Sequence, residues 1–161
     1  MDYTAHERIR LMPIGELIGL SEWLTITQKM ISEFGAVTQD PDPMHLDLEW
    51  AARNGPFGGT IAYGFLTLSL LTTLFNSAVG DPPSRDRHSK GAYVNYGLGR
   101  IRFVAPVPAS ARIRGRFALA ERREDELGRL IMTVAATIEI EGEERPALVG
   151  EWLFAWIPPH A

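Results

Sequence analysis

The longest apolar run of the chain, TIAYGFLTLSLLTTLF from Thr60 to Phe75, restricts the possible folds more than any other segment. As a helix it would be apolar around most of its circumference, which is typical of a helix buried on several sides. The run is too short and too rich in hydroxyl groups to span a membrane. It therefore predicts an internal helix that other elements surround.

Four extended segments follow this run and can surround it. The sequences ARIRGRFALA and TVAATIEIEG alternate apolar and polar residues, as strands with one buried face do. The separators APVPAS, EDELG and EGEERP are short, which favours antiparallel neighbours. We expect an α+β fold in which a curved antiparallel sheet wraps the apolar helix. The expected strands cover about residues 92–104, 111–123, 129–141 and 146–157.

Two further helices are expected before the apolar run. Apolar residues at helical spacing predict a helix over about residues 27–38, with Thr25 or Thr27 as its N-cap. DLEWAARN predicts a short second helix capped by Asp47 and ended by Gly55-Pro56. The polar segment GDPPSRDRHSKG after the apolar run predicts a surface loop.

Length and composition limit the class of protein. A chain of 161 residues favours one domain, here residues 1–161. The net charge of −4, without a long basic block, argues against nucleic acid as a partner. The absence of cysteine excludes disulfides, thiolate nucleophiles and zinc–thiolate sites. The N-terminal MDYTAHERIR has no apolar core of a secretory signal, so a cytoplasmic location and no membrane partner are expected.

The segment TQDPDPMHLD concentrates titratable side chains, and three interpretations compete for it. Asp40 and Asp42 precede prolines and Asp47 precedes a helix, so each can serve a turn or a cap. A calcium loop would need glycine at its sixth position and glutamate at its twelfth, where this segment has His45 and Ala51. Zinc would need a second histidine or a cysteine, so no metal is expected.

The third interpretation makes Asp40 and His45 a general acid/base pair. A rigid turn with two prolines can aim both side chains at one water molecule, and histidine titrates near neutral pH. The alternative for His45, a hydrogen-bonded histidine of the core, stays open on residue type alone.

The start of the apolar run offers a second chemical feature. GGTIAYGFL presents unpaired backbone N–H groups, which suit an oxygen that gains negative charge during a reaction, such as a thioester carbonyl. Gly64 is the expected donor because a residue without a side chain allows a ligand to approach closely. A glycine that serves helix packing alone is the alternative.

These segments resemble a known family. FGAVTQDPDPMHLDLEWA is similar to the hydratase-2 motif Asp-x-Asn-Pro-x-His of the MaoC-like dehydratases, which falls on Asp40, Pro43 and His45. GPFGGTIAYGFLTLSLL and VNYGLGRIRFVAPVPASARIRGR resemble the nodulation protein N-like branch of the (R)-specific enoyl-CoA hydratases. The likeness covers about residues 20–155 in the same order.

The resemblance implies a single hot-dog domain, a homodimer, and reversible addition of water to a trans-2-enoyl-CoA. It implies no cofactor beyond the CoA of the acyl-CoA substrate. It assigns water activation to Asp40 and His45, and binding of the thioester oxygen to the backbone N–H of Gly64. Arg85, Arg87, Lys90 and Arg100 are candidates to hold the CoA phosphates only by charge and loop position.

Three positions depart from the family pattern. Gln39 stands where the family usually has glycine, and Asp42 stands where it has asparagine. A second carboxylate close to Asp40 can raise the pKa of one or both groups. Tyr63 stands where the family often has histidine or glutamine, and it can pack or donate a hydrogen bond near the substrate.

Two other functions remain open at this point. A hot-dog thioesterase would direct water at the carbonyl carbon, and such enzymes commonly carry an acidic residue on the central helix. This chain has none between Ile61 and Phe75, which favours the hydratase. In a non-catalytic acyl-binding module, Asp40 and His45 would act only as caps or core residues.

Overall fold

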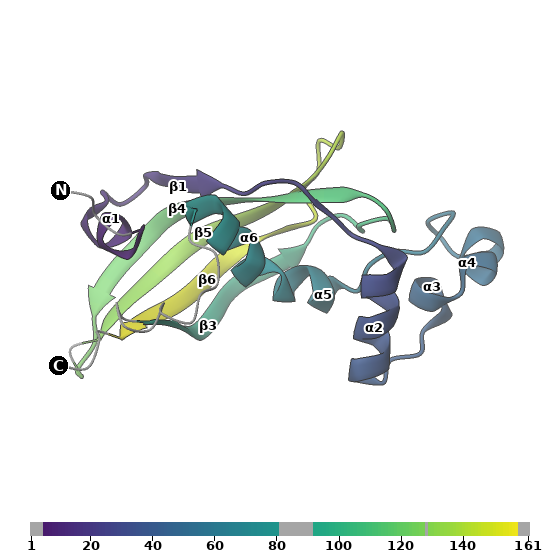
Figure 1. Cartoon of the computed structure of the whole chain (residues 1–161), viewed down its shortest axis with the longest axis horizontal. Helices are drawn as coiled ribbons and strands as arrows, with labels where there is room; N and C mark the ends of the chain where they lie inside the picture. Colours follow the sequence, from purple (N-terminus) through teal and green to yellow (C-terminus); the bar gives the residue numbers. More distant parts are fainter. Residues whose placement is uncertain (1–4, 81–91, 128, 158–161) are drawn as a thin grey trace.

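The computed structural model describes residues 5–80, 92–127 and 129–157 of the chain. A long antiparallel sheet forms one layer; one helical segment packs over a face of it, and another group of helices lies beyond its end (Figure 1). The strand order is β1-β4-β5-β6-β3, and β2 also pairs with β4. The strands are β1 (Leu17–Leu20), β2 (Leu24–Thr25), β3 (Ala92–Phe103), β4 (Arg112–Glu124), β5 (Leu130–Ile140) and β6 (Leu148–Ile157).

The four long strands confirm the predicted extended segments, but not every pair of strands that follow each other in the chain is adjacent in the sheet. β4, β5 and β6 pair in sequence, whereas β3 pairs with β6 rather than with β4. The segment between β3 and β4 makes no tight hairpin, because its backbone bonds elsewhere: Ala109 N–H donates to Thr60, and Ser110 N–H donates to Ile26. β3 therefore lies at one edge of the sheet.

The central helix runs as two segments, α5 (Gly64–Ser69) and α6 (Leu71–Val79), joined at Leu70. The predicted start at Thr60 was four residues too early, because this part of the chain is extended and Ile61 forms a β-bridge with Pro108. α6 lies across the sheet (Figure 1).

The core lies between α6 and the sheet. The ring of Phe75 packs edge-on against Phe117, Trp152 and Phe154, with centroids 5.3 to 5.4 Å apart. Gly115 allows α6 to approach β4, since a Cβ there would lie 3.0 Å from the Cβ of Leu74. Aromatic rings supply large apolar areas to this contact.

The central helix is not surrounded on every side, contrary to the expectation from its composition. Leu66, Leu71 and Leu74 are buried, whereas Phe65 is 68% exposed. Ser69, Thr72, Thr73 and Ser77 are also exposed. One flank of the helix is thus open in a single copy of the chain.

The predicted helices before the apolar run are confirmed with their caps. α2 (Gln28–Thr38) begins after Thr27, whose side chain accepts from Met30 N–H, and α4 (Leu48–Asn54) begins after Asp47. The sequence did not predict α1 (Ala5–Leu11), α3 (Pro43–Leu46) or the short strands β1 and β2. The loop predicted at residues 80–91 lies, apart from Gly80, outside the described residues.

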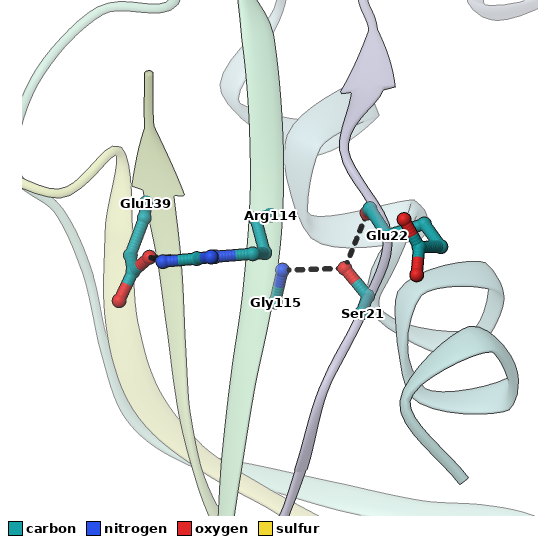
Figure 2. A network of polar contacts seen from close by, with 5 residues as sticks. All are labelled: Ser21, Glu22, Arg114, Gly115 and Glu139. Atoms are coloured by element: carbon teal, nitrogen blue, oxygen red, sulfur yellow. Dashed lines mark hydrogen bonds and ion pairs between the residues drawn. The ribbon is translucent and has the colours of Figure 1, made fainter. Parts of the chain in front are cut away.

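A polar network joins the segment after β1 to the sheet (Figure 2). The Gly115 N–H donates to the Ser21 hydroxyl at 2.9 Å, and that hydroxyl donates to the carbonyl of Glu22 at 2.7 Å. On the neighbouring residue of β4, Arg114 donates twice to Glu139 of β5, at 2.9 and 2.5 Å. Ser21 thus replaces a ladder bond where the chain passes from β1 to β2. Among the described residues, no helix is long and apolar enough to cross a membrane.

Candidate active site

The end of α2 determines where Asp40 lies. Gln39 adopts a left-handed conformation with φ 57° and ψ 36°. Its N–H bonds the carbonyl of Ala36 at 3.4 Å, and the Asp40 N–H bonds the carbonyl of Gly35 at 3.1 Å. This pair of bonds is a Schellman motif, which normally has glycine at the left-handed position. The structure therefore explains the family's glycine at position 39 as a backbone requirement.

Asp42 starts the short helix α3. Its carboxylate accepts from Met44 N–H at 2.8 Å, and Pro43 occupies the first helical turn. The Asp42 N–H in turn lies 3.4 Å from Oδ1 of Asp40, so the two residues are neighbours in space. Both side chains are exposed. Asp42 is thus an N-cap, and Asp47 is the N-cap of the next helix, as expected.

His45 is held by its ring and by its backbone. The residue is buried, and Nδ1 lies 2.7 Å from the carbonyl oxygen of Ile61. Because a carbonyl can only accept, Nδ1 carries a proton, which leaves Nε2 of the neutral ring as a base. The Gln28 side chain donates to the His45 carbonyl at 2.8 Å and accepts from the Thr60 hydroxyl at 2.6 Å. His45 therefore presents one defined nitrogen.

Tyr63 joins Asp40 to His45. Its ring lies against the His45 ring, with centroids 3.8 Å apart and planes tilted by 34°. Its hydroxyl donates to the backbone carbonyl of Asp40 at 2.6 Å. Burial raises the pKa of the Tyr63 hydroxyl, and the nearby carboxylates of Asp40 and Asp42 raise it further. The hydroxyl thus stays a donor at neutral pH.

A pocket of about 380 Å³ opens beside His45 and the start of α5. His45, Gly64 and Thr67 contribute its polar groups, and most of its wall is apolar. Asp40, Asp42 and Tyr63 are not among the residues that line it, so the motif residue in the pocket wall is His45. The remaining lining residues are Met44, Phe57, Ile61, Ala62, Phe103, Val104, Ala105, Pro106, Val107 and Ala147.

Gly64 serves packing as well as the pocket. A Cβ at this position would lie 3.2 Å from the ring of Phe103, so the glycine lets β3 approach α5 closely. Gly64 is also the first residue of α5, and the N-cap Tyr63 provides no side-chain cap. The first N–H groups of a helix lack partners within the helix and can bind an oxygen. The structure is therefore compatible with both interpretations of Gly64, as a packing residue and as an N–H donor to an oxygen.

The sequence analysis missed several residues that build the site. Gln28 and Phe103 gave no signal, since their contacts depend on the tertiary fold. Gly35 did give a signal, because a glycine within a predicted helix often marks a place where another group packs closely. Arg85, Arg87 and Lys90 lie outside the described residues, and Arg100 is exposed at a bulge of β3. No three described His, Asp or Glu side chains form a metal-binding group.

The fold and the site together define a hot-dog protein with a histidine at a pocket beside the central helix. The family described as "MaoC like domain" matches residues 11–142. The chain belongs to this MaoC-like dehydratase family.

Curated relatives agree. The chain is 46% identical over 140 residues to "Nodulation protein N" of Rhizobium leguminosarum bv. viciae, covering 87% of this chain and 84% of that protein. It is 39% identical over 145 residues to "3-hydroxyacyl-thioester dehydratase Z" of Mycobacterium tuberculosis, covering 89% and 90%.

Solved structures support the same fold. The unliganded R-hydratase PhaJ1 from Pseudomonas aeruginosa superposes with a TM-score of 0.71 at 19% identity, covering 95% of this chain and 86% of that one. At this identity the likeness shows the hot-dog fold. Family and relatives together support hydro-lyase chemistry in general.

Proposed function

We propose that the chain is an (R)-specific enoyl-CoA hydratase that adds water reversibly to trans-2-enoyl-CoA. The observation that carries the proposal is the pocket that His45 and Gly64 both line, with Nδ1 of His45 held by the carbonyl of Ile61 so that Nε2 is left as the base. A base and an oxyanion donor on one apolar pocket suit the addition of water to a conjugated thioester. We take the substrate class from the mycobacterial relative, whose name describes action on 3-hydroxyacyl thioesters.

In the proposed reaction, Asp40 and His45 hold one water molecule and remove a proton from it. The water oxygen forms a bond to C3 of the alkene, and the π electrons move through C2 onto the thioester oxygen. The N–H of Gly64 stabilises the negative charge on that oxygen. When the enolate collapses, C2 takes a proton back from the Asp40–His45 pair, which restores the pair, and the product is a 3-hydroxyacyl thioester. The reverse sequence is dehydration.

The proposed partner of the chain is a second copy of itself. β3 is an edge strand, and Val94, Tyr96, Leu98 and Phe103 on it are 44 to 53% exposed. Phe65 on the open flank of the central helix is exposed as well. Unpaired strand edges with apolar side chains favour association, and symmetric dimers are the commonest form. A dimer through β3 would cover this flank and the exposed Phe103, which lines the pocket.

Incubation with crotonyl-CoA tests the reaction. A hydratase removes the alkene absorbance without releasing thiol, a thioesterase releases thiol, and a binding module does neither. Chiral analysis of the 3-hydroxybutyryl product tests the (R) assignment. Asp40→Asn and His45→Ala are each expected to lose about 10²–10⁴-fold in turnover.

Asp47→Asn is the matched control for Asp40→Asn. It makes the same chemical change at the cap of α4, outside the pocket, and should retain activity. Parental turnover of Asp40→Asn or His45→Ala on every enoyl-CoA would refute the assignment of that residue.

A further inference from the structure

Gly35 is a buried residue within helix α2, where glycine is less stable than alanine. A Cβ built on Gly35 would overlap the Tyr63 hydroxyl oxygen. The same Cβ would lie 3.1 Å from Cζ of Tyr63 and 3.2 Å from the carbonyl oxygen of Asp40. The missing side chain of Gly35 is thus the space that the Tyr63 hydroxyl occupies.

The backbone of Asp40 is held on both sides by this arrangement. Its N–H bonds the carbonyl of Gly35 at 3.1 Å, and its carbonyl accepts from the Tyr63 hydroxyl at 2.6 Å. Pro41 follows and restricts Asp40 to extended backbone conformations. With the backbone restrained at both peptide groups, the direction of the Cα–Cβ bond that carries the exposed carboxylate is fixed.

The same tyrosine also restrains His45. Its ring packs on the imidazole at 3.8 Å between centroids, while Ile61 holds Nδ1. The Tyr63 side chain therefore contacts both Asp40 and His45. Tyr63 is also the N-cap residue of α5 and directly precedes Gly64 at the start of that helix.

We propose that Tyr63 is a positioning residue, whose hydroxyl holds the backbone of Asp40 and whose ring holds His45, and that Gly35 provides the room for the hydroxyl. The catalytic part of this inference rests on the proposed hydratase function. Tyr63 acts through its two neighbours, consistent with its absence from the pocket wall. Geometry of this kind matters because small displacements of a base slow a reaction strongly.

A double-mutant cycle tests the contact without any assay of activity. Gly35→Ala in the parent should raise the unfolding equilibrium constant by about tenfold or more, because overpacking a core contact is costly. Tyr63→Phe keeps the ring and removes the hydroxyl. In this background, Gly35→Ala should raise the unfolding equilibrium constant clearly less than it does in the parent. The control pair is Gly19→Ala with Tyr63→Phe, because the Cβ at Gly19 would meet Ala78 instead. That pair should be additive.

Amide hydrogen exchange tests whether the Tyr63 hydroxyl restrains the backbone of Asp40, and it also needs no activity assay. The Asp40 N–H should exchange about tenfold faster in Tyr63→Phe than in the parent, as loss of a neighbouring hydrogen bond allows. The Trp50 N–H, capped by Asp47 in α4, should exchange at the parental rate. Unchanged exchange at Asp40, or additive energies for Gly35 and Tyr63, would overturn the inference.

Kinetics then separate a positioning role from general damage to the fold. Tyr63→Phe should lower kcat for crotonyl-CoA by about tenfold or more with KM within about twofold, since the base is misplaced while the acyl-CoA contacts remain. Parental kcat would overturn the positioning role. If the parent hydrates no enoyl-CoA at all, the proposed function fails, and the cycle and the exchange measurement still decide whether Tyr63 and Gly35 hold Asp40.

Discussion

The Nδ1 nitrogen of His45 donates to the carbonyl oxygen of Ile61 at 2.7 Å. This contact selects the tautomer of the ring, so that Nε2 is the free base. It also gives the buried ring a structural role, because without it the Ile61 carbonyl loses a partner in a buried place. The catalytic and structural interpretations of His45 are therefore compatible.

The first prediction follows from this double role. His45→Ala should lower turnover by about 10²–10⁴-fold and the free energy of unfolding by about 1–3 kcal/mol. His45→Asn can still donate to Ile61 through its amide, so it should recover part of the stability and none of the activity. Denaturant unfolding and crotonyl-CoA kinetics on both variants check this. Equal activity in His45→Asn and the parent would contradict it.

The second prediction concerns the left-handed residue Gln39. A residue with a Cβ is strained at φ 57°, and glycine is not. Gln39→Gly should therefore raise the free energy of unfolding by up to about 1 kcal/mol, even though glycine makes the unfolded chain more flexible. Ala36→Gly, within the regular part of α2, is the control and should lower stability by about 1 kcal/mol. If Gln39→Gly and Ala36→Gly lowered the free energy of unfolding equally, position 39 would not be strained.

Local signals in the sequence were sufficient for much of this structure. The N-caps Thr27 and Asp47 were predictable because a hydroxyl or carboxylate side chain bonds the helix it begins. The long strands were predictable because their burial alternates, as β4 shows over Arg112–Glu124. α3 was missed since four residues after two prolines look like a turn, although Pro43 is typical of a first helical position.

The remaining features depend on tertiary contacts that no local pattern encodes. The pairing of β3 with β6 requires the path of the chain between β3 and β4. The motif predicted that Asp40 and His45 act together, but the position of Tyr63 between them depends on the chain just before α5 reaching the end of α2 and the ring of His45. The open flank at Phe65 was hidden for a similar reason, because composition reports apolar character and not what covers it.

The third prediction uses the raised pKa of Tyr63. Its hydroxyl has an ordinary value of 10.0, and burial followed by Asp40 and Asp42 raises it in the folded chain. Above pH 10 the unfolded chain loses this proton first, so the folded state binds more protons and stability falls as pH rises. The stability difference between the parent and Tyr63→Phe should be constant up to about pH 9 and shrink above about pH 10. A constant difference at every pH would contradict the shift.

The fourth prediction concerns the proposed dimer. Leu98 on β3 is 53% exposed, and a charge there would be buried by a second copy. Light scattering should give about twice 17.9 kDa for the parent and a mass close to 17.9 kDa for Leu98→Asp. Leu127→Asp makes the same change at a 77% exposed residue between β4 and β5 and should stay dimeric. A parent protein that is a monomer at micromolar concentration would refute the dimer.

The last prediction concerns Asp42, which stands where the family motif has asparagine. Its carboxylate caps α3 through Met44, and asparagine caps helices about as well, so Asp42→Asn should keep the fold. Its N–H lies 3.4 Å from Oδ1 of Asp40, so the backbone of Asp42, rather than its side chain, contacts the proposed base.

Asp42→Asn should therefore leave the enzyme both folded and active, because the asparagine side chain still accepts from Met44 N–H. Denaturant unfolding and crotonyl-CoA kinetics of the variant beside the parent check this. Asp47→Asn makes the same change at the cap of α4 and should also stay folded and active. A loss of turnover in Asp42→Asn that Asp47→Asn does not show would mean that the Asp42 carboxylate does more than cap α3.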